Sequence, residues 1–195
     1  ILAIKGFYNE NKLKNYGKDG SLFGEHPPKP NLLPGIEAST GSLGHGLPIA
    51  VGIALGAKMQ KKTFKTYVLV GDGECGEGTI WESAIIAAAN DLDNLFVIID
   101  YNKWQATNKI NEVMGSIDFK KKWKSFNWDV YNVKGNDISK IDKVFNNLKK
   151  NKKPKLILSD SIKGHGVKFM QNDNNWHYRI PTIDEVNKSK KILLG

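Results

Sequence analysis

The sequence predicts a doubly wound α/β domain, in which helices cover both faces of a mainly parallel sheet. Two short apolar segments, residues 67–70 and 95–99, flank a stretch with helical periodicity, residues 79–90. The first apolar segment runs into the glycine-rich residues 71–73 and the second into the polar residues 100–102. A strand, a helix and a second strand at this spacing form a parallel βαβ unit, the building block of such domains.

The remaining segments supply the other elements of this fold. We expect strands at residues 128–133 and 156–158 and helices at residues 118–126 and 137–148, with a final helix from Thr182 or Asp184. Asp137 is positioned to cap the second of these helices, and five apolar residues form a stripe along it, namely Ile138, Ile141, Val144, Phe145 and Leu148. The proline-rich residues 21–31 and residues 103–116 are expected to be loops near the active site.

Small residues recur every four positions at Gly46, Ala50 and Ala54, which gives one helix a smooth face for close packing. This spacing fits an interior contact or a subunit interface equally well.

The composition indicates one domain, residues 1–195, with a core of its own. The single cysteine, Cys75, cannot form an internal disulfide and reads as a small packing residue, so we expect a cytoplasmic protein. The longest apolar stretch, residues 47–57, is short and interrupted by glycine, so we expect no membrane-spanning segment.

The net charge of +9 raises the alternative of a lysine-rich, non-catalytic binding protein. The excess is lysine, with Arg179 the only arginine, whereas specific readers of nucleic acid depend on arginine. The densest basic runs, residues 120–124 and 149–153, are typical of solvated helix ends. We therefore expect no nucleic-acid partner, although a basic surface would attract anionic sugar phosphates.

Asp72 and Asn102 each follow a predicted strand of the βαβ unit. Because parallel strands end at the same edge of a sheet, the two side chains can converge where open α/β sheets hold ligands. Carboxylate and amide oxygens suit Mg²⁺, which takes about six oxygens and is usually shared with phosphate and water. Glycines 71, 73, 76 and 78 let a phosphate approach the backbone, and a helix beginning near Gly76 would offer free N–H groups.

Residues 71–76 also match G-x-G-x-x-G, a weak signature of nicotinamide-binding Rossmann domains, and a purely structural turn is a further alternative. Asp72 favours the metal, because a carboxylate in the turn would repel a bare pyrophosphate. Only the metal interpretation also accounts for Asn102.

Five ordered motifs resemble the transketolase family, over a region from Gly6 to about Ile183. They are Glu25-His26-Pro27, residues 35–46 (GIEASTGSLGHG), Gly71-Asp72-Gly73 with Asn102, residues 162–166 (IKGHG) and Trp176-His177. The resemblance is to the N-terminal subunit or domain of that family and implies thiamine diphosphate and Mg²⁺ as cofactors.

The resemblance also implies roles for individual residues. Asp72, the side chain of Asn102 and the main-chain carbonyl of Trp104 would bind Mg²⁺, and Gly73 and Asn102 would contact the diphosphate. The other implied cofactor contacts are the backbone of Gly41, Ser42 and Leu43 and the side chains of Lys163 and His177.

Further implied roles concern the substrate and the subunit interface. His26 and His177 would face the sugar and move protons, for which the near-neutral pKa of histidine is suited. Glu77, which we count among the catalytic candidates, and Glu82 would join a carboxylate network at a subunit interface.

The implied reaction, part of pentose phosphate and carbohydrate metabolism, transfers a two-carbon ketol unit from a ketose phosphate to an aldose. A separate subunit or domain would have to supply the pyrimidine-binding half, in a dimer or heterotetramer, and this chain should be inactive without it. The abrupt start at Ile1 suggests that the N-terminal part of the domain is missing. Another thiamine diphosphate-dependent synthase of the same superfamily is the alternative.

Overall fold

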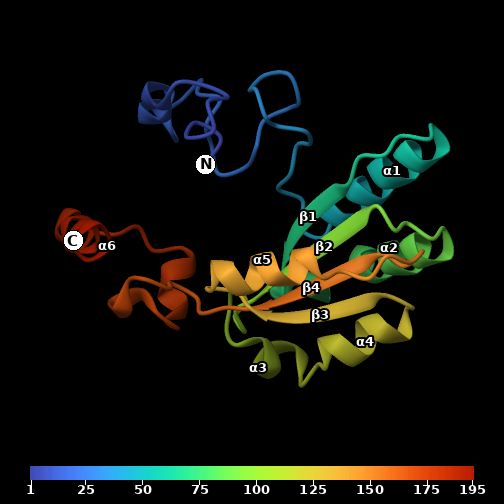
Figure 1. The fold of residues 1–195 in the computed structure, drawn as a ribbon. Coiled ribbons are helices and arrows are strands. Elements are labelled where there is room, and N and C mark those ends of the chain that lie inside the picture. The colour runs from blue at the N-terminus through green and yellow to red at the C-terminus, as the bar shows by residue number, and fades with distance from the viewer.

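The computed structural model describes residues 1–195 and has a four-stranded, wholly parallel sheet at its centre (Figure 1). The strands are β1 (Thr66–Gly71), β2 (Leu95–Tyr101), β3 (Asp129–Lys134) and β4 (Lys155–Asp160), in the order β1-β2-β4-β3. All strands therefore end at one edge of the sheet.

Helices lie on both faces of the sheet (Figure 1), so the predicted doubly wound α/β architecture is confirmed. The α-helices are α1 (Gly46–Met59), α2 (Gly78–Ala89), α3 (Ile110–Met114), α4 (Phe119–Ser125), α5 (Ile138–Asn146) and α6 (Ile183–Leu194). Four short 3-10 helices are η1 (Glu10–Asn15), η2 (Gly73–Gly76), η3 (Lys168–Met170) and η4 (Asn174–His177).

The main core lies between one sheet face and helices α1, α2 and α4. Alternate residues of the central strands, such as Val97 and Ile99, are fully buried in it. Trp128, which precedes β3, packs edge-to-face on Trp123 of α4 at 4.8 Å between ring centroids, and its Nε1 donates to the carbonyl of Ala84 in α2 at 2.9 Å. These contacts fix α2 and α4 on the same face of the sheet.

The small-residue face of α1 forms an interior contact. Ala50 and Ala54 are buried, and α1 packs on α2 and β1. The spacing seen in the sequence is thus explained by close packing between α1 and its neighbours within the chain.

The other sheet face is only partly covered. Tyr67 stacks on Phe96 at 4.9 Å and approaches Phe145 of α5 at 6.2 Å, but Tyr67 and Leu69 remain 53% and 68% exposed. The predicted stripe of α5 is therefore only partly used: Ile138 is 83% exposed and no residue of this helix is fully buried.

Two predicted boundaries need correction. The sequence predicts loop over residues 103–116, but they contain α3, whose first residue, Ile110, is buried in the core. Five helical residues are too few to show a periodicity in sequence. Helix α5 ends at Asn146 rather than Leu148, although the Asp137 carboxylate caps it as predicted by accepting the N–H of Lys140.

Thr182, rather than Asp184, begins α6 with a capping box to Glu185. No helix of the structure has the length and apolar character that crossing a membrane requires.

Candidate functional site

Asp72 lies at the end of β1 and reaches the turn that follows β2. Its side chain is buried, and its backbone N–H donates to the carbonyl of Asp100 at 3.3 Å. Asp72 Oδ1 accepts the N–H of Gly73 at 2.9 Å, and Oδ2 accepts the N–H of Lys103 at 2.6 Å. Lys103 directly follows Asn102, so the structure brings the two polar strand ends together.

Both polar atoms of the Asn102 side-chain amide make hydrogen bonds. Its Nδ2 donates to Asp100 Oδ2 at 3.0 Å, and its Oδ1 accepts the N–H of Trp104 at 2.9 Å. No protein group donates a hydrogen bond to the carbonyl oxygen of Trp104. One carboxylate, one amide oxygen and one carbonyl oxygen that accepts no hydrogen bond therefore belong to residues that follow the neighbouring strands β1 and β2 at the same sheet edge.

Carboxylate, amide and carbonyl oxygens are the ligand types that a hard divalent cation prefers. Burial, opposed by the two N–H groups and assisted by the charge of Asp100, raises the pKa of Asp72 from 3.8 to about 6. No lysine or arginine side chain pairs with Asp72, and a bound cation would favour its ionised form. No group of three or more His, Cys, Asp or Glu side chains is placed to hold a metal; Mg²⁺ needs only one or two carboxylates when phosphate completes its shell.

The raised pKa of Asp72 predicts a pH-dependent stability in the metal-free protein. The folded state binds this proton more tightly than the unfolded chain, so the stabilisation is complete below pH 3.8 and is lost as the pH rises through about 6. Between pH 8 and pH 5, wild-type protein should gain about 1.4 kcal/mol in free energy of unfolding relative to Asp72→Asn, which cannot titrate. Urea unfolding of both proteins at the two pH values measures this difference, and an unchanged difference would contradict the burial argument.

The glycine-rich turn after β1 is tightly enclosed. A Cβ at Gly73 would lie 2.9 Å from Cγ of Gln105, so any larger residue would push against the loop that follows β2. Helix η2 occupies residues 73–76 and α2 begins at Gly78, slightly later than the sequence suggests. Backbone N–H groups of this turn are candidates for phosphate contacts.

Glu74 is a site residue that no sequence pattern singles out. Its Oε1 accepts the N–H of Gly44 at 2.9 Å and its Oε2 accepts the N–H of Gly71 at 3.1 Å. Thr79 Oγ1 donates to the carbonyl of Gly44 at 2.9 Å. These bonds hold residues 41–44 against the turn after β1, across about thirty residues of sequence that no local pattern spans.

His26 lies against the same loop. A Cβ at Gly41, whose φ is +132°, would meet the His26 ring at 2.8 Å. The predicted cofactor-facing backbone of Gly41, Ser42 and Leu43 is thus bounded by His26 on one side and, through Gly44, by Glu74 on the other.

Lys163 and His177 form a second pair, after β4. Lys163 Nζ lies 3.5 Å from His177 Nδ1. Asn174, in the same 3-10 helix as His177, donates from Nδ2 to the carbonyl of Ala106 at 3.0 Å, which ties this helix to the loop after β2. Partial burial, followed by the positive charge of Lys163, lowers the pKa of His177 below its usual 6.5.

Replacing Lys163 with methionine should therefore raise the pKa of His177, because it removes the nearby positive charge. Burial remains, so the pKa should stay below 6.5. Titration of the imidazole resonances by NMR measures the shift, with Lys168→Met as a control on the same segment. An unchanged His177 pKa in Lys163→Met would show that the two side chains do not interact in solution.

Two glutamates named from the sequence are not joined to these clusters by side-chain hydrogen bonds. Glu77 precedes α2 and its stem packs on Gly44, while its carboxylate and that of Glu82 are exposed and accept no hydrogen bond. Cys75 is buried, and burial raises the pKa of its thiol, which makes it an unreactive packing residue.

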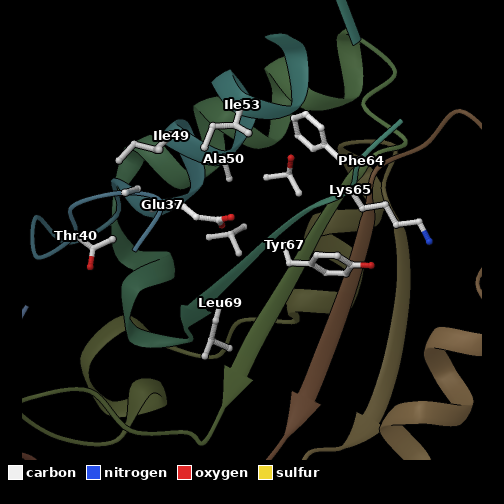
Figure 2. Close-up of a pocket in the computed structure, with 13 residues that line it drawn as sticks. Glu37, Thr40, Ile49, Ala50, Ile53, Phe64, Lys65, Tyr67 and Leu69 are labelled. Carbon is white, nitrogen blue, oxygen red and sulfur yellow. The ribbon is translucent and has the colours of Figure 1, made fainter. Parts of the chain in front are cut away.

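A large hollow lies along the edge strand β1. It measures about 730 Å³ and is lined by apolar side chains of α1 and β1, among them Ile49, Ile53 and Leu69 (Figure 2). It contains none of the candidate cofactor or metal residues. Its lining is mainly apolar, but Glu37, Thr40 and Lys65 also contribute to it (Figure 2).

Comparison with known protein families matches the whole chain. The family model described as "Transketolase, thiamine diphosphate binding domain" covers residues 1–195.

Curated relatives include a subunit of apulose-4-phosphate transketolase from Phocaeicola vulgatus, 41% identical over 96% of this chain and 66% of the relative. The protein of the same name from Actinobacillus succinogenes is 40% identical over 98% of this chain and 69% of the relative. The 6-deoxy-6-sulfo-D-fructose transketolase subunit SqwG of a Clostridium species is 34% identical over 87% and 62%. The chain thus spans about two thirds of the length of these relatives.

Solved transketolase structures have the same fold as this chain. Transketolase from Campylobacter jejuni superposes with a TM-score of 0.86 at 28% identity, covering 93% of this chain and 29% of that one. Transketolase from Pichia stipitis, in complex with sedoheptulose 7-phosphate, gives 0.85 at 29% identity, covering 93% and 28%.

Proposed function

Since this chain belongs to the transketolase family, as its thiamine diphosphate-binding part, we propose that it transfers a two-carbon ketol unit from a ketose phosphate to an aldose together with a partner. The single observation that carries this proposal is that hydrogen bonds join Asp72, after β1, to the segment Asn102–Trp104, after β2, beside a glycine-rich turn.

In this proposal Asp72, the Asn102 side chain and the Trp104 carbonyl hold Mg²⁺, and Gly73 and Asn102 contact the diphosphate. The loop Gly41–Leu43 lines the cofactor with its backbone, because Glu74 and Thr79 fix the end of that loop beside the turn. Thiamine diphosphate supplies the carbanion and the electron sink when it is bound.

His177 and His26 are the proposed proton donors and acceptors of this chain. The lowered pKa of His177 leaves its ring neutral at pH 7, so it can accept a proton or a hydrogen bond from a sugar hydroxyl. Lys163 beside it offers a positive charge to an anionic group. His26, against Gly41, is placed on the loop that lines the cofactor and would contact the sugar from that side.

We further propose that a C-terminal subunit or domain supplies the pyrimidine-binding half and that this chain is inactive without it. Two observations support the partner: three relatives are named as transketolase subunits, and the chain covers under a third of each of the two solved transketolase chains. A sugar phosphate substrate is supported by the name apulose-4-phosphate transketolase and by the sedoheptulose 7-phosphate complex. Glu77 and Glu82, both exposed, are available for an interface with such a partner.

Thermal unfolding tests the cofactor part of the proposal. Thiamine diphosphate and Mg²⁺ together, at about 100 times the dissociation constant, should stabilise the protein by about 2.7 kcal/mol and raise its midpoint by about 5–10 °C. Either component alone should raise it far less. Stabilisation by NAD without metal would instead support a Rossmann domain, and no response to any of them would refute the proposal.

A further inference from the structure

Asp100 is not among the residues assigned to the metal or the cofactor, yet it contacts both Asp72 and Asn102. We propose that Asp100 is a positioning residue that fixes the side-chain amide of Asn102 with its oxygen, rather than its nitrogen, presented to Mg²⁺. The inference rests on the proposed metal site, but the contacts that carry it belong to this chain alone.

The orientation of an asparagine amide matters for metal binding. Its oxygen and its NH₂ group are similar in size and exchange places by a half-turn of the terminal torsion, but only the oxygen has lone pairs to offer a cation. A freely rotating amide would present the wrong group part of the time. A metal site built on asparagine therefore gains affinity when the protein selects one orientation in advance.

Two neighbours of Asn102 select the same orientation. Asp100 Oδ2 can only accept, and it receives Nδ2 of Asn102 at 3.0 Å; the backbone N–H of Trp104 can only donate, and it meets Oδ1 at 2.9 Å. A flipped amide would set oxygen against carboxylate and NH₂ against N–H, losing both bonds. In the observed orientation, Oδ1 keeps a second lone pair for a cation.

Asp100 is itself fixed from a neighbouring strand segment. Its other oxygen accepts a hydrogen bond from the hydroxyl of Ser161, which directly follows β4. The backbone carbonyl of Asp100 accepts the N–H of Asp72 at 3.3 Å. One residue of the central strand β2 thus connects the carboxylate ligand, the amide ligand and the end of β4.

Asp160 provides a matched control for a general loss of negative charge. It ends β4, pairs with Tyr101 in the sheet register, and so lies at the same sheet edge as Asp100. Its carboxylate contacts Lys103 Nζ at 2.5 Å and makes no hydrogen bond to Asn102. Because its side chain is 57% exposed, water screens its charge and its removal should have little effect on the metal.

The test exchanges the two side chains in the full-length protein. Calorimetric titration with MgCl₂ at saturating thiamine diphosphate gives the Mg²⁺ affinity of Asp100→Asn, Asn102→Asp, the double variant and Asp160→Asn. Asp100→Asn should weaken Mg²⁺ binding about 10- to 100-fold. Asn102→Asp should also weaken it, because two carboxylates would then face each other.

The double variant should recover most of the affinity. The amide introduced at position 100 would then donate to the carboxylate introduced at position 102, whose second oxygen stays available to the metal. The same hydrogen bond is thus made with donor and acceptor exchanged. Asp160→Asn should change the affinity by less than about 3-fold. A double variant no better than Asp100→Asn, or equal losses in Asp100→Asn and Asp160→Asn, would overturn the proposal.

A second readout needs no metal. The side-chain NH₂ resonances of Asn102 in the metal-free protein should shift in Asp100→Asn and stay in place in Asp160→Asn, because only the first change replaces their carboxylate acceptor with a neutral amide. If the Asn102 NH₂ resonances had the same chemical shifts in Asp100→Asn as in wild type, the inference would be overturned. Wild-type protein that binds no Mg²⁺ with thiamine diphosphate would instead refute the proposed function, and the metal role of Asp100 with it.

Discussion

Asp72→Asn is expected to lower the affinity for thiamine diphosphate in the presence of Mg²⁺ by more than about 100-fold. Residues that only orient metal ligands already cost about 10- to 100-fold when they are changed, and Asp72 is the one carboxylate of the proposed ligand set. The substitution keeps the size of the side chain but replaces a charged oxygen by an NH₂ group, and this group has no lone pair available to bind a cation.

Calorimetric titration with thiamine diphosphate and MgCl₂ measures this loss. Asp93→Asn is the matched control, because Asp93 is exposed and precedes β2 at the opposite edge of the sheet. It should leave the affinity unchanged. Retained affinity in Asp72→Asn would show that the cofactor binds without this carboxylate.

Gly44→Ala is expected to destabilise the protein by about 3 kcal/mol and to weaken cofactor binding. The φ of Gly44 is +79°, a left-handed conformation that costs an L-residue about 1–2 kcal/mol. A Cβ there would also lie 2.5 Å from Cβ of Glu77 and 2.6 Å from Oγ1 of Thr79, and such overpacking adds about 1–3 kcal/mol. The loop that lines the cofactor would have to move away from the turn.

Urea unfolding measures the effect, with Gly52→Ala as a control of opposite sign. Gly52 lies within α1 with open space around its would-be Cβ, so alanine should stabilise the helix by about 0.5–1 kcal/mol. If Gly44→Ala unfolded at the same urea concentration as wild type, the contact between residues 41–44 and the turn would not be part of the folded state in solution.

The elements with strong periodicity could be predicted from the sequence, and those that depend on distant partners could not. The βαβ unit of β1, α2 and β2 is visible because apolar strands alternate with a helix over residues 66–101. Helix α3 has too few residues to show a pattern, and it is stabilised by the burial of Ile110 in a core built from other segments. The exposure of Ile138 likewise reflects how little of the sheet α5 covers.

The same distinction applies to the residues of the candidate site. Asp72 and Asn102 could be placed at one edge because parallel strands end together, and the family resemblance added the loop at Gly41–Leu43. Glu74 could not be found, because it acts through a hydrogen bond to Gly44, thirty residues away. The role of Asp100 was also hidden, because the hydroxyl of Ser161, sixty-one residues away, helps to fix its carboxylate beside Asn102. A carboxylate in a turn has many possible partners, and only the folded chain shows which one it meets.

Anomalous diffraction from crystals grown with thiamine diphosphate and MnCl₂ would locate the metal, since Mn²⁺ replaces Mg²⁺ at oxygen ligands. We expect one strong peak within coordination distance of Asp72, Asn102 Oδ1 and the carbonyl oxygen of Trp104, with the diphosphate beside Gly73. A cofactor bound with no metal at these three oxygens, or a peak held by other side chains, would contradict the proposed metal site.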